Sequence, residues 1–98
     1  MKEDKKKFIR LRDIWLEETS CMSSMTDIVN NNAYQEIILM GDSVLTYIFE
    51  DLQDSPKFWF QALRMITGTQ PYIPESSVGK VSEISYIWLA WGKENNYI

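Results

Sequence analysis

The chain has 98 residues, of which 45% are apolar and 24% charged, with a net charge of −4, one cysteine and no histidine. This length and apolar content fit one globular domain with its own core and exclude a disordered chain. The single Cys21 excludes an internal disulfide, and no apolar run reaches the roughly 18 residues that a membrane span needs.

The N-terminal stretch is basic and leads into a predicted helix over Lys5–Ser20, where Phe8, Leu11 and Trp15 recur on one stripe. Its charged start is followed by no apolar segment, so we expect no signal peptide and a cytoplasmic protein. Residues 1–7 form a basic arm whose lysines oppose the helix dipole, and we expect this arm to be frayed.

The distribution of charge is one-sided along the chain. Six of the ten basic residues lie in the first twelve positions, whereas residues 13–56 hold nine acidic residues and no basic one. We therefore expect a basic arm on an acidic body.

Two helical elements are predicted after a serine-rich break. Ser24 and Asp27 give a loose capping-box match that begins a short turn through Val29. Asn32 is placed to cap a helix over Ala33–Met40, which the following glycine ends.

A further helix is predicted up to about Gln53, with Asp42 or Ser43 as its N-cap. Its apolar residues form a single arc on a helical wheel. Glu50 and Asp51 fall outside this arc, so both are expected to face solvent.

The centre of the core is predicted to be a helix over Pro56–Thr67, capped by Ser55 and ended by Gly68. Its apolar arc is broad enough to be covered from several directions, and we expect Trp59 in the core. Phe60 instead falls on the polar side. Either the loop over residues 68–74 covers it, particularly through Tyr72 or Ile73, or it anchors a partner.

The last helix is predicted from about Ser77 to Glu94, with Asn95 or Asn96 as its left-handed stop. Short connections between the central helices favour antiparallel neighbours. The expected fold is one all-α domain over residues 1–98, a compact bundle of about four to six helices packed as antiparallel hairpins.

A resemblance to a known family rests on four segments, residues 33–41, 59–64, 66–68 and 88–92. Together they resemble a family of small uncharacterised bacterial helical proteins. The helix that ends at Ile66-Thr67-Gly68, followed by a loop and a Trp-containing helix, is similar to the end of a HEAT-type repeat. The likeness covers about Trp15 to Tyr97 and implies a HEAT-like fold. Because the family has no established activity, the resemblance implies no catalytic residue.

The residue types argue against catalysis and against bound cofactors. Without histidine and with one cysteine, neither a nucleophile–base dyad of those types nor a His- or Cys-rich zinc site can form. The Asn-rich stretch before Glu36 lacks the glycine of an EF-hand loop. We therefore predict no catalytic, metal or cofactor-binding residue and no enzyme.

The first functional hypothesis is a non-enzymatic interaction module whose acidic surface binds a basic protein, in the manner of antitoxin, immunity or inhibitor proteins. The candidate partner-binding residues are Glu17, Glu18, Glu50, Asp51, Phe60, Arg64 and Tyr72. Two alternatives stay open. One is a homo-oligomeric structural protein held through Phe60 and Tyr72, and the other is a weak nucleic-acid binder using the Lys-rich arm, which the acidic body disfavours.

Overall fold

The computed structural model describes residues 2–98, and these form six α-helices, two short 3-10 helices and no β-strand. The α-helices are α1 (Lys2–Thr19), α2 (Met25–Val29), α3 (Asn32–Leu39), α4 (Leu45–Asp54), α5 (Phe60–Thr67) and α6 (Val81–Glu94). The 3-10 helices cover Gly41–Val44 and Glu75–Ser77. The prediction of an all-α bundle with four to six helices is confirmed.

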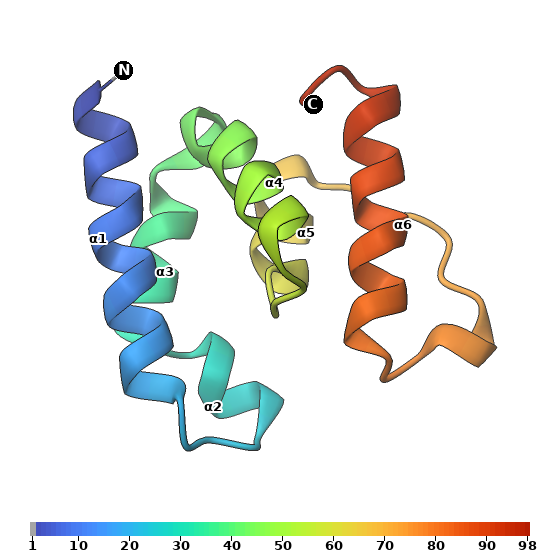
Figure 1. The fold of residues 1–98 in the computed structure, drawn as a ribbon, viewed down its shortest axis with the longest axis horizontal. Coiled ribbons are helices and arrows are strands. Elements are labelled where there is room, and N and C mark those ends of the chain that lie inside the picture. The colour runs from blue at the N-terminus through green and yellow to red at the C-terminus, as the bar shows by residue number, and fades with distance from the viewer. Residues whose placement is uncertain (1) are drawn as a thin grey trace.

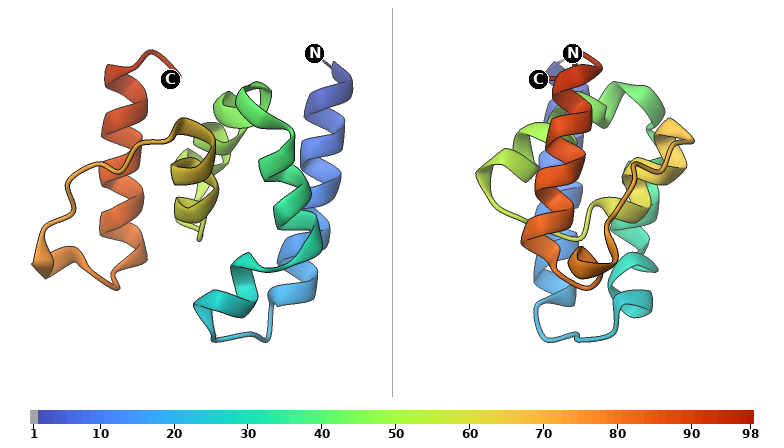
Figure 2. Two further views of the ribbon diagram at one scale, coloured as in Figure 1. Left: turned by 180° about the vertical axis from the view of Figure 1, so that it is seen from behind. Right: turned by 90° about the vertical axis from the view of Figure 1, so that its right-hand side faces the viewer.

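Helices α1, α3, α4 and α5 alternate in direction, whereas α6 runs in the same direction as α5, as Figures 1 and 2 show. The long helix α1 lies at one edge, α4 and α5 occupy the middle, and α6 forms the opposite edge. α3 packs against both α1 and α5, whereas α6 packs against α4 and α5. Figure 2 shows from behind and from the side that α1 begins and α6 ends at the same end of the molecule.

The core is built around the indole of Trp59, which is fully buried as predicted. Its ring centroid lies 4.6 Å from that of Trp15 and 5.6 Å from those of both Phe8 and Tyr34. We call these four residues the first aromatic cluster. Since its members come from α1, α3 and the segment before α5, this cluster ties the N-terminal half of the fold together.

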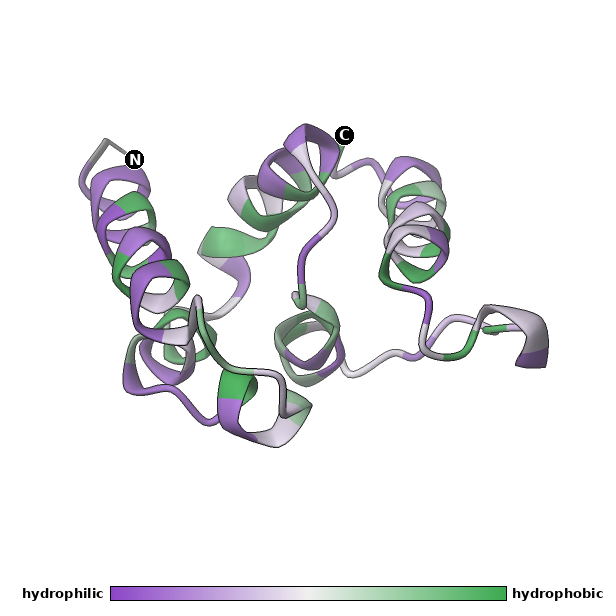
Figure 3. Ribbon diagram, turned by 60° about the horizontal axis from the view of Figure 1, so that its bottom comes forward, coloured by the Kyte–Doolittle hydropathy of each residue, from purple (hydrophilic) through white to green (hydrophobic). Residues whose placement is uncertain are grey.

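A second aromatic cluster joins α4 to α6 and the C-terminus. The ring of Phe49 stacks on Tyr97 at 5.5 Å and on Trp91 at 6.1 Å, and Trp88 meets Trp91 edge-on at 5.6 Å. Figure 3 shows that hydrophobic and hydrophilic residues alternate along the helices, as expected for helices that bury one face.

Two helix stops that were predicted from local sequence signals are confirmed. Gly68 ends α5 with φ of +69°, and Asn96 follows α6 with φ of +66°. The N-caps agree less well. Asn31, rather than Asn32, caps α3 by accepting hydrogen bonds from two backbone amides, and the Ser24 side chain makes no capping hydrogen bond.

The starts of several helices differ from the prediction. α1 already begins at Lys2, before the predicted Lys5, while Met1 lies outside the described residues and fraying of the arm stays a prediction. The predicted start of the last helix at Ser77 is wrong, because Gly79 has φ of +82° and breaks the helix there. α5 begins at Phe60 instead of Pro56, for a reason that lies in the candidate site.

Candidate functional site

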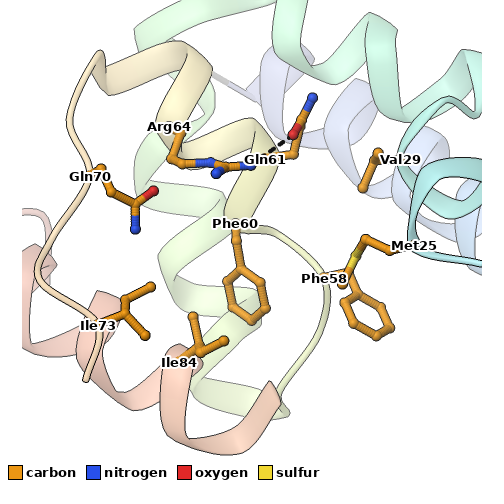
Figure 4. Close-up of a pocket in the computed structure, with 9 residues that line it drawn as sticks. All are labelled: Met25, Val29, Phe58, Phe60, Gln61, Arg64, Gln70, Ile73 and Ile84. Atoms are coloured by element: carbon orange, nitrogen blue, oxygen red, sulfur yellow. Dashed lines mark hydrogen bonds between the residues drawn. The ribbon is translucent and has the colours of Figure 1, made fainter. Parts of the chain in front are cut away.

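An apolar hollow of about 170 Å³ lies beside Phe60, and we call it the Phe60 hollow (Figure 4). Five parts of the chain build it: α2, the segment that runs into α5, α5 itself, the loop after α5, and α6. Its lining consists of six apolar and three polar residues, namely Met25, Val29, Phe58, Phe60, Gln61, Arg64, Gln70, Ile73 and Ile84.

The run Phe58-Trp59-Phe60 positions the aromatic walls of the hollow. Trp59 points into the core, where its indole N–H donates to Oδ2 of Asp51 at 2.9 Å. The two phenylalanines on either side are half-buried, and their rings meet nearly at right angles with centroids 6.4 Å apart. Because the middle residue of the run takes the core position, its neighbours are left to line the hollow.

The hydroxyl of Tyr34 explains why α5 begins late. It donates to the carbonyl oxygen of Phe58 at 2.8 Å and accepts from the backbone N–H of Ala62 at 2.9 Å. These two backbone groups are four residues apart and would bond each other if the helix began one residue earlier. Tyr34 takes the place of that bond, so Phe58 stays outside the helix and the predicted N-cap at Ser55 is wrong.

Burial of the Tyr34 side chain keeps its hydroxyl protonated. Burial raises the pKa of Tyr34 well above its ordinary value, and this outweighs the opposing effects of the Ala62 hydrogen bond and the Arg64 charge. A protonated hydroxyl can donate and accept at once, which is what the bridge between Phe58 and Ala62 requires.

The polar groups of the hollow gather on the α5 side and the loop, as Figure 4 shows. A terminal guanidinium nitrogen of Arg64 donates to the side-chain oxygen of Gln61 at 2.9 Å. Arg64 is exposed, and it forms no ion pair with a carboxylate among the described side chains. The hollow therefore combines an apolar interior with one cation that has no charged partner within the described chain.

A second hollow, of about 290 Å³, shares Phe58 with the first, and we call it the Met22 hollow. It is lined by residues of α1, the α1–α2 connection, α2, the segment before α5 and the first residue of α6, namely Trp15, Leu16, Thr19, Ser20, Met22, Ile28, Pro56, Lys57, Phe58 and Val81. Met22 and Met25, one from each hollow, are 45% and 47% exposed. Flexible apolar side chains thus stand beside both hollows.

The structure does not gather the predicted acidic residues on one surface. Glu17 and Glu18 are exposed near the end of α1, and Glu18 accepts a hydrogen bond from the Asn31 side chain at 2.9 Å. Glu50 is exposed on α4 but lines a separate shallow depression together with Lys5 of α1. Glu50 therefore faces basic residues of its own chain.

The prediction that Asp51 faces solvent is wrong. Its Oδ1 accepts from Arg12 at 2.9 Å, while its Oδ2 accepts from the Trp59 indole and lies 3.2 Å from Nζ of Lys57. Burial of Asp51 is tolerated because two cations and an N–H satisfy the carboxylate. Burial lowers the pKa of Arg12, but hydrogen bonds and charge from Asp13 and Asp51 outweigh it and raise that pKa.

Of the two interpretations of Phe60, cover by the loop over residues 68–74 agrees in part with the structure, and the role of Phe60 as a partner anchor stays a prediction. Ile73 and Gln70 of the loop line the hollow with Phe60, whereas Tyr72 is 83% exposed and lies outside it. Met65 falls in the apolar arc of α5 on a helical wheel, yet it is 57% exposed.

The sequence reasoning named Ile73 beside Phe60 but missed Met25, Val29 and Ile84 as lining residues. One signal was available in the sequence, since three consecutive aromatic residues cannot all face one core. It identifies Phe58 as a companion of Phe60 but not the opposite wall.

Other kinds of site find no support in residues 2–98. These residues contain no group of three or more side chains suited to hold a metal ion, and none of their helices is both long and apolar enough to cross a membrane. Comparisons of the chain with models of protein families, with curated proteins and with solved structures found no match.

Proposed function

We propose that this chain is a non-enzymatic protein-interaction module whose contact site is the Phe60 hollow. The observation that supports it is an apolar, aromatic-walled hollow on the surface of a small domain that buries Trp15, Trp59 and Trp88 completely. Exposed apolar surface of this kind is typical of interaction sites, and aromatic residues near an arginine are typical interface anchors.

The size of the hollow favours a side chain over a drug-sized ligand. Pockets for small molecules usually measure roughly 300–1,000 Å³, and the Phe60 hollow measures about 170 Å³. An apolar cavity of about 150 Å³ is sufficient for benzene. The hollow therefore suits one ring-sized side chain, which an anchor residue of a protein partner would supply.

The methionines beside the hollows support the same proposal. Met side chains have three rotatable bonds and a polarisable sulfur, so they adapt to the shape of an incoming surface. Met22 lies in the α1–α2 connection and Met25 begins α2, and both are about half-exposed. Met25, which lines the Phe60 hollow, can therefore adapt to an anchor side chain that enters it.

Net charge supports a basic partner as the second part of the proposal. Residues 13–98 contain twelve acidic and four basic residues, and Glu17, Glu18 and Glu50 are exposed among them. Such a charge excess accelerates encounter with a cationic protein in a salt-dependent way. Replacing these three glutamates with glutamine should slow association at low salt. Unchanged association would remove the basic partner from the proposal.

The contact site is tested with one variant that fills the hollow and one matched control. A partner is captured from a lysate of the source organism, purified and titrated calorimetrically against each protein. Ile73→Trp fills the hollow and should weaken binding at least tenfold, which corresponds to about 1.4 kcal/mol. Tyr72→Ala changes the adjacent, exposed residue of the same loop and should bind like the wild type. Equal binding by the Ile73 variant would refute the contact site.

A homo-oligomeric structural protein is the second candidate function. The exposure of Tyr72 at 83% and of Tyr86 at 74% favours it, because exposed aromatic residues are enriched at interfaces. Light scattering during size exclusion decides between the two, and a monomer at high concentration would refute the second candidate.

A further inference from the structure

We propose that the Phe60 hollow recognises a partner segment in which an apolar side chain lies next to an Asp or Glu, and that Arg64 pairs with that carboxylate. This inference rests on the proposed function and adds to it the chemistry of the partner. It is carried by the combination of an apolar interior with a cation that pairs with no carboxylate among residues 2–98.

Three other cations of the chain are engaged with carboxylates of their own chain. Arg12 and Lys57 both bind the buried Asp51, and Lys80 lies 3.6 Å from Glu83. Arg64 differs from them, since its hydrogen-bond partner is the neutral Gln61 side chain at 2.9 Å. A guanidinium has five N–H donors, so most of its donor capacity is directed to the outside.

The spacing on α5 fixes how far apart the two contacts lie. Phe60 and Arg64 are four residues apart and therefore lie one turn apart on the same face of the helix. An anchor side chain beside Phe60 places the adjacent residues of the partner within one helical turn of Arg64. The anchor and the acid should thus be near neighbours in the partner's surface.

The chemistry of the pair favours a carboxylate. A planar guanidinium matches a carboxylate with two parallel hydrogen bonds, which adds direction as well as energy. Ile73 and Ile84 lie near the Phe60 ring, away from the Arg64 guanidinium, so they would pack on the apolar side chain of the partner (Figure 4). Arg64 is exposed, however, so we expect only a two- to fivefold contribution, the range of solvent-exposed pairs.

The probe for this inference is a displayed library of random 12-residue peptides, selected in parallel against the wild type, Arg64→Glu and Ile73→Trp. Circular dichroism melts first establish that each variant is folded. Wild-type selections should enrich a large apolar residue with Asp or Glu nearby, and Arg64→Glu selections should enrich Lys or Arg at the acidic position. The Ile73 variant should enrich neither. In a selected peptide, changing the acid to its amide should weaken binding to the wild type two- to fivefold.

Each other outcome overturns a defined part of the reasoning. Enrichment of apolar residues without an acid, or without a change for Arg64→Glu, refutes the carboxylate pairing and leaves the module intact. Equal enrichment by Ile73→Trp refutes both the pairing and the contact site. Absence of enrichment refutes recognition of a short segment. If light scattering then shows a dimer that Ile73→Trp dissociates, the occupant is a second copy of the chain.

Discussion

Replacing Tyr34 with Phe removes one oxygen atom and tests what determines the start of α5. The hydroxyl is fully buried and bridges the carbonyl of Phe58 and the N–H of Ala62, at 2.8 Å and 2.9 Å. The ring remains, and its stacking on Trp59 at 5.6 Å should remain with it. The substitution therefore removes the bridge and little else.

The expected loss follows from the two groups that the bridge satisfies. Leaving a buried donor or acceptor without a partner costs about 1–3 kcal/mol, so the two together amount to about 2–6 kcal/mol. Part of this is recovered if the carbonyl of Phe58 and the N–H of Ala62 approach each other. We expect a net loss of about 2–4 kcal/mol, which lowers the melting temperature of a domain of this size by about 10–20 °C.

Urea unfolding followed by circular dichroism measures this loss, and Tyr72→Phe is the matched control because its hydroxyl is in an 83% exposed residue. The control should unfold like the wild type. Hydrogen exchange at Ala62 should accelerate in Tyr34→Phe because its amide loses its acceptor. A loss below about 1 kcal/mol would show that Phe58 and Ala62 bond directly, and that Tyr34 does not determine where α5 begins.

Three further predictions concern stability. Burial raises the pKa of Tyr34 above its ordinary value of 10, so the protonated hydroxyl stabilises the fold fully below pH 10, and this contribution is lost as the pH rises above 10. In urea melts above pH 10, the free energy of unfolding should therefore fall by about 1.4 kcal/mol more per pH unit in the wild type than in Tyr34→Phe. Equal pH dependence in the two proteins would contradict this. Asp51→Ala should lower the free energy of unfolding by about 3–5 kcal/mol, whereas Glu50→Ala, at the exposed neighbouring residue, should lower it by under about 0.5 kcal/mol. Similar denaturant midpoints for the two variants would place Asp51 outside the core. Gly92→Ala would bring a Cβ to 2.8 Å from the Phe49 ring and should destabilise by about 1–3 kcal/mol, despite the better helix propensity of alanine; a raised melting temperature would show that the ring moves freely.

Features that depend on neighbouring residues in the chain were predictable. Gly68 and Asn96 take the left-handed conformation at helix ends because few other residues adopt it without strain. The buried position of Trp59 followed from its size and its place in a broad apolar arc. Such signals determine the number of helices and most of their C-terminal ends.

Features that depend on distant residues were not predictable. The start of α5 is set by Tyr34, which lies 24 residues before Phe58. The inward orientation of Asp51 is set partly by Arg12, which lies 39 residues away in the chain. A helical wheel of α4 contains no information on Arg12 and places Asp51 outside the apolar arc. The Phe60 hollow depends on where α2 and α6 lie relative to α5, and no local sequence pattern determines these relative positions.

The positions of the two aromatic clusters along the chain bear on the order in which its parts can fold during synthesis. Every member of the first cluster lies between Phe8 and Trp59, so these rings can pack before α6 has been made. The second cluster has only Phe49 outside the C-terminal segment. Because Ile84 of α6 forms part of the wall of the Phe60 hollow, the hollow is completed only when the last helix docks. A growing chain would thus bury its first core before it has a finished contact site to present.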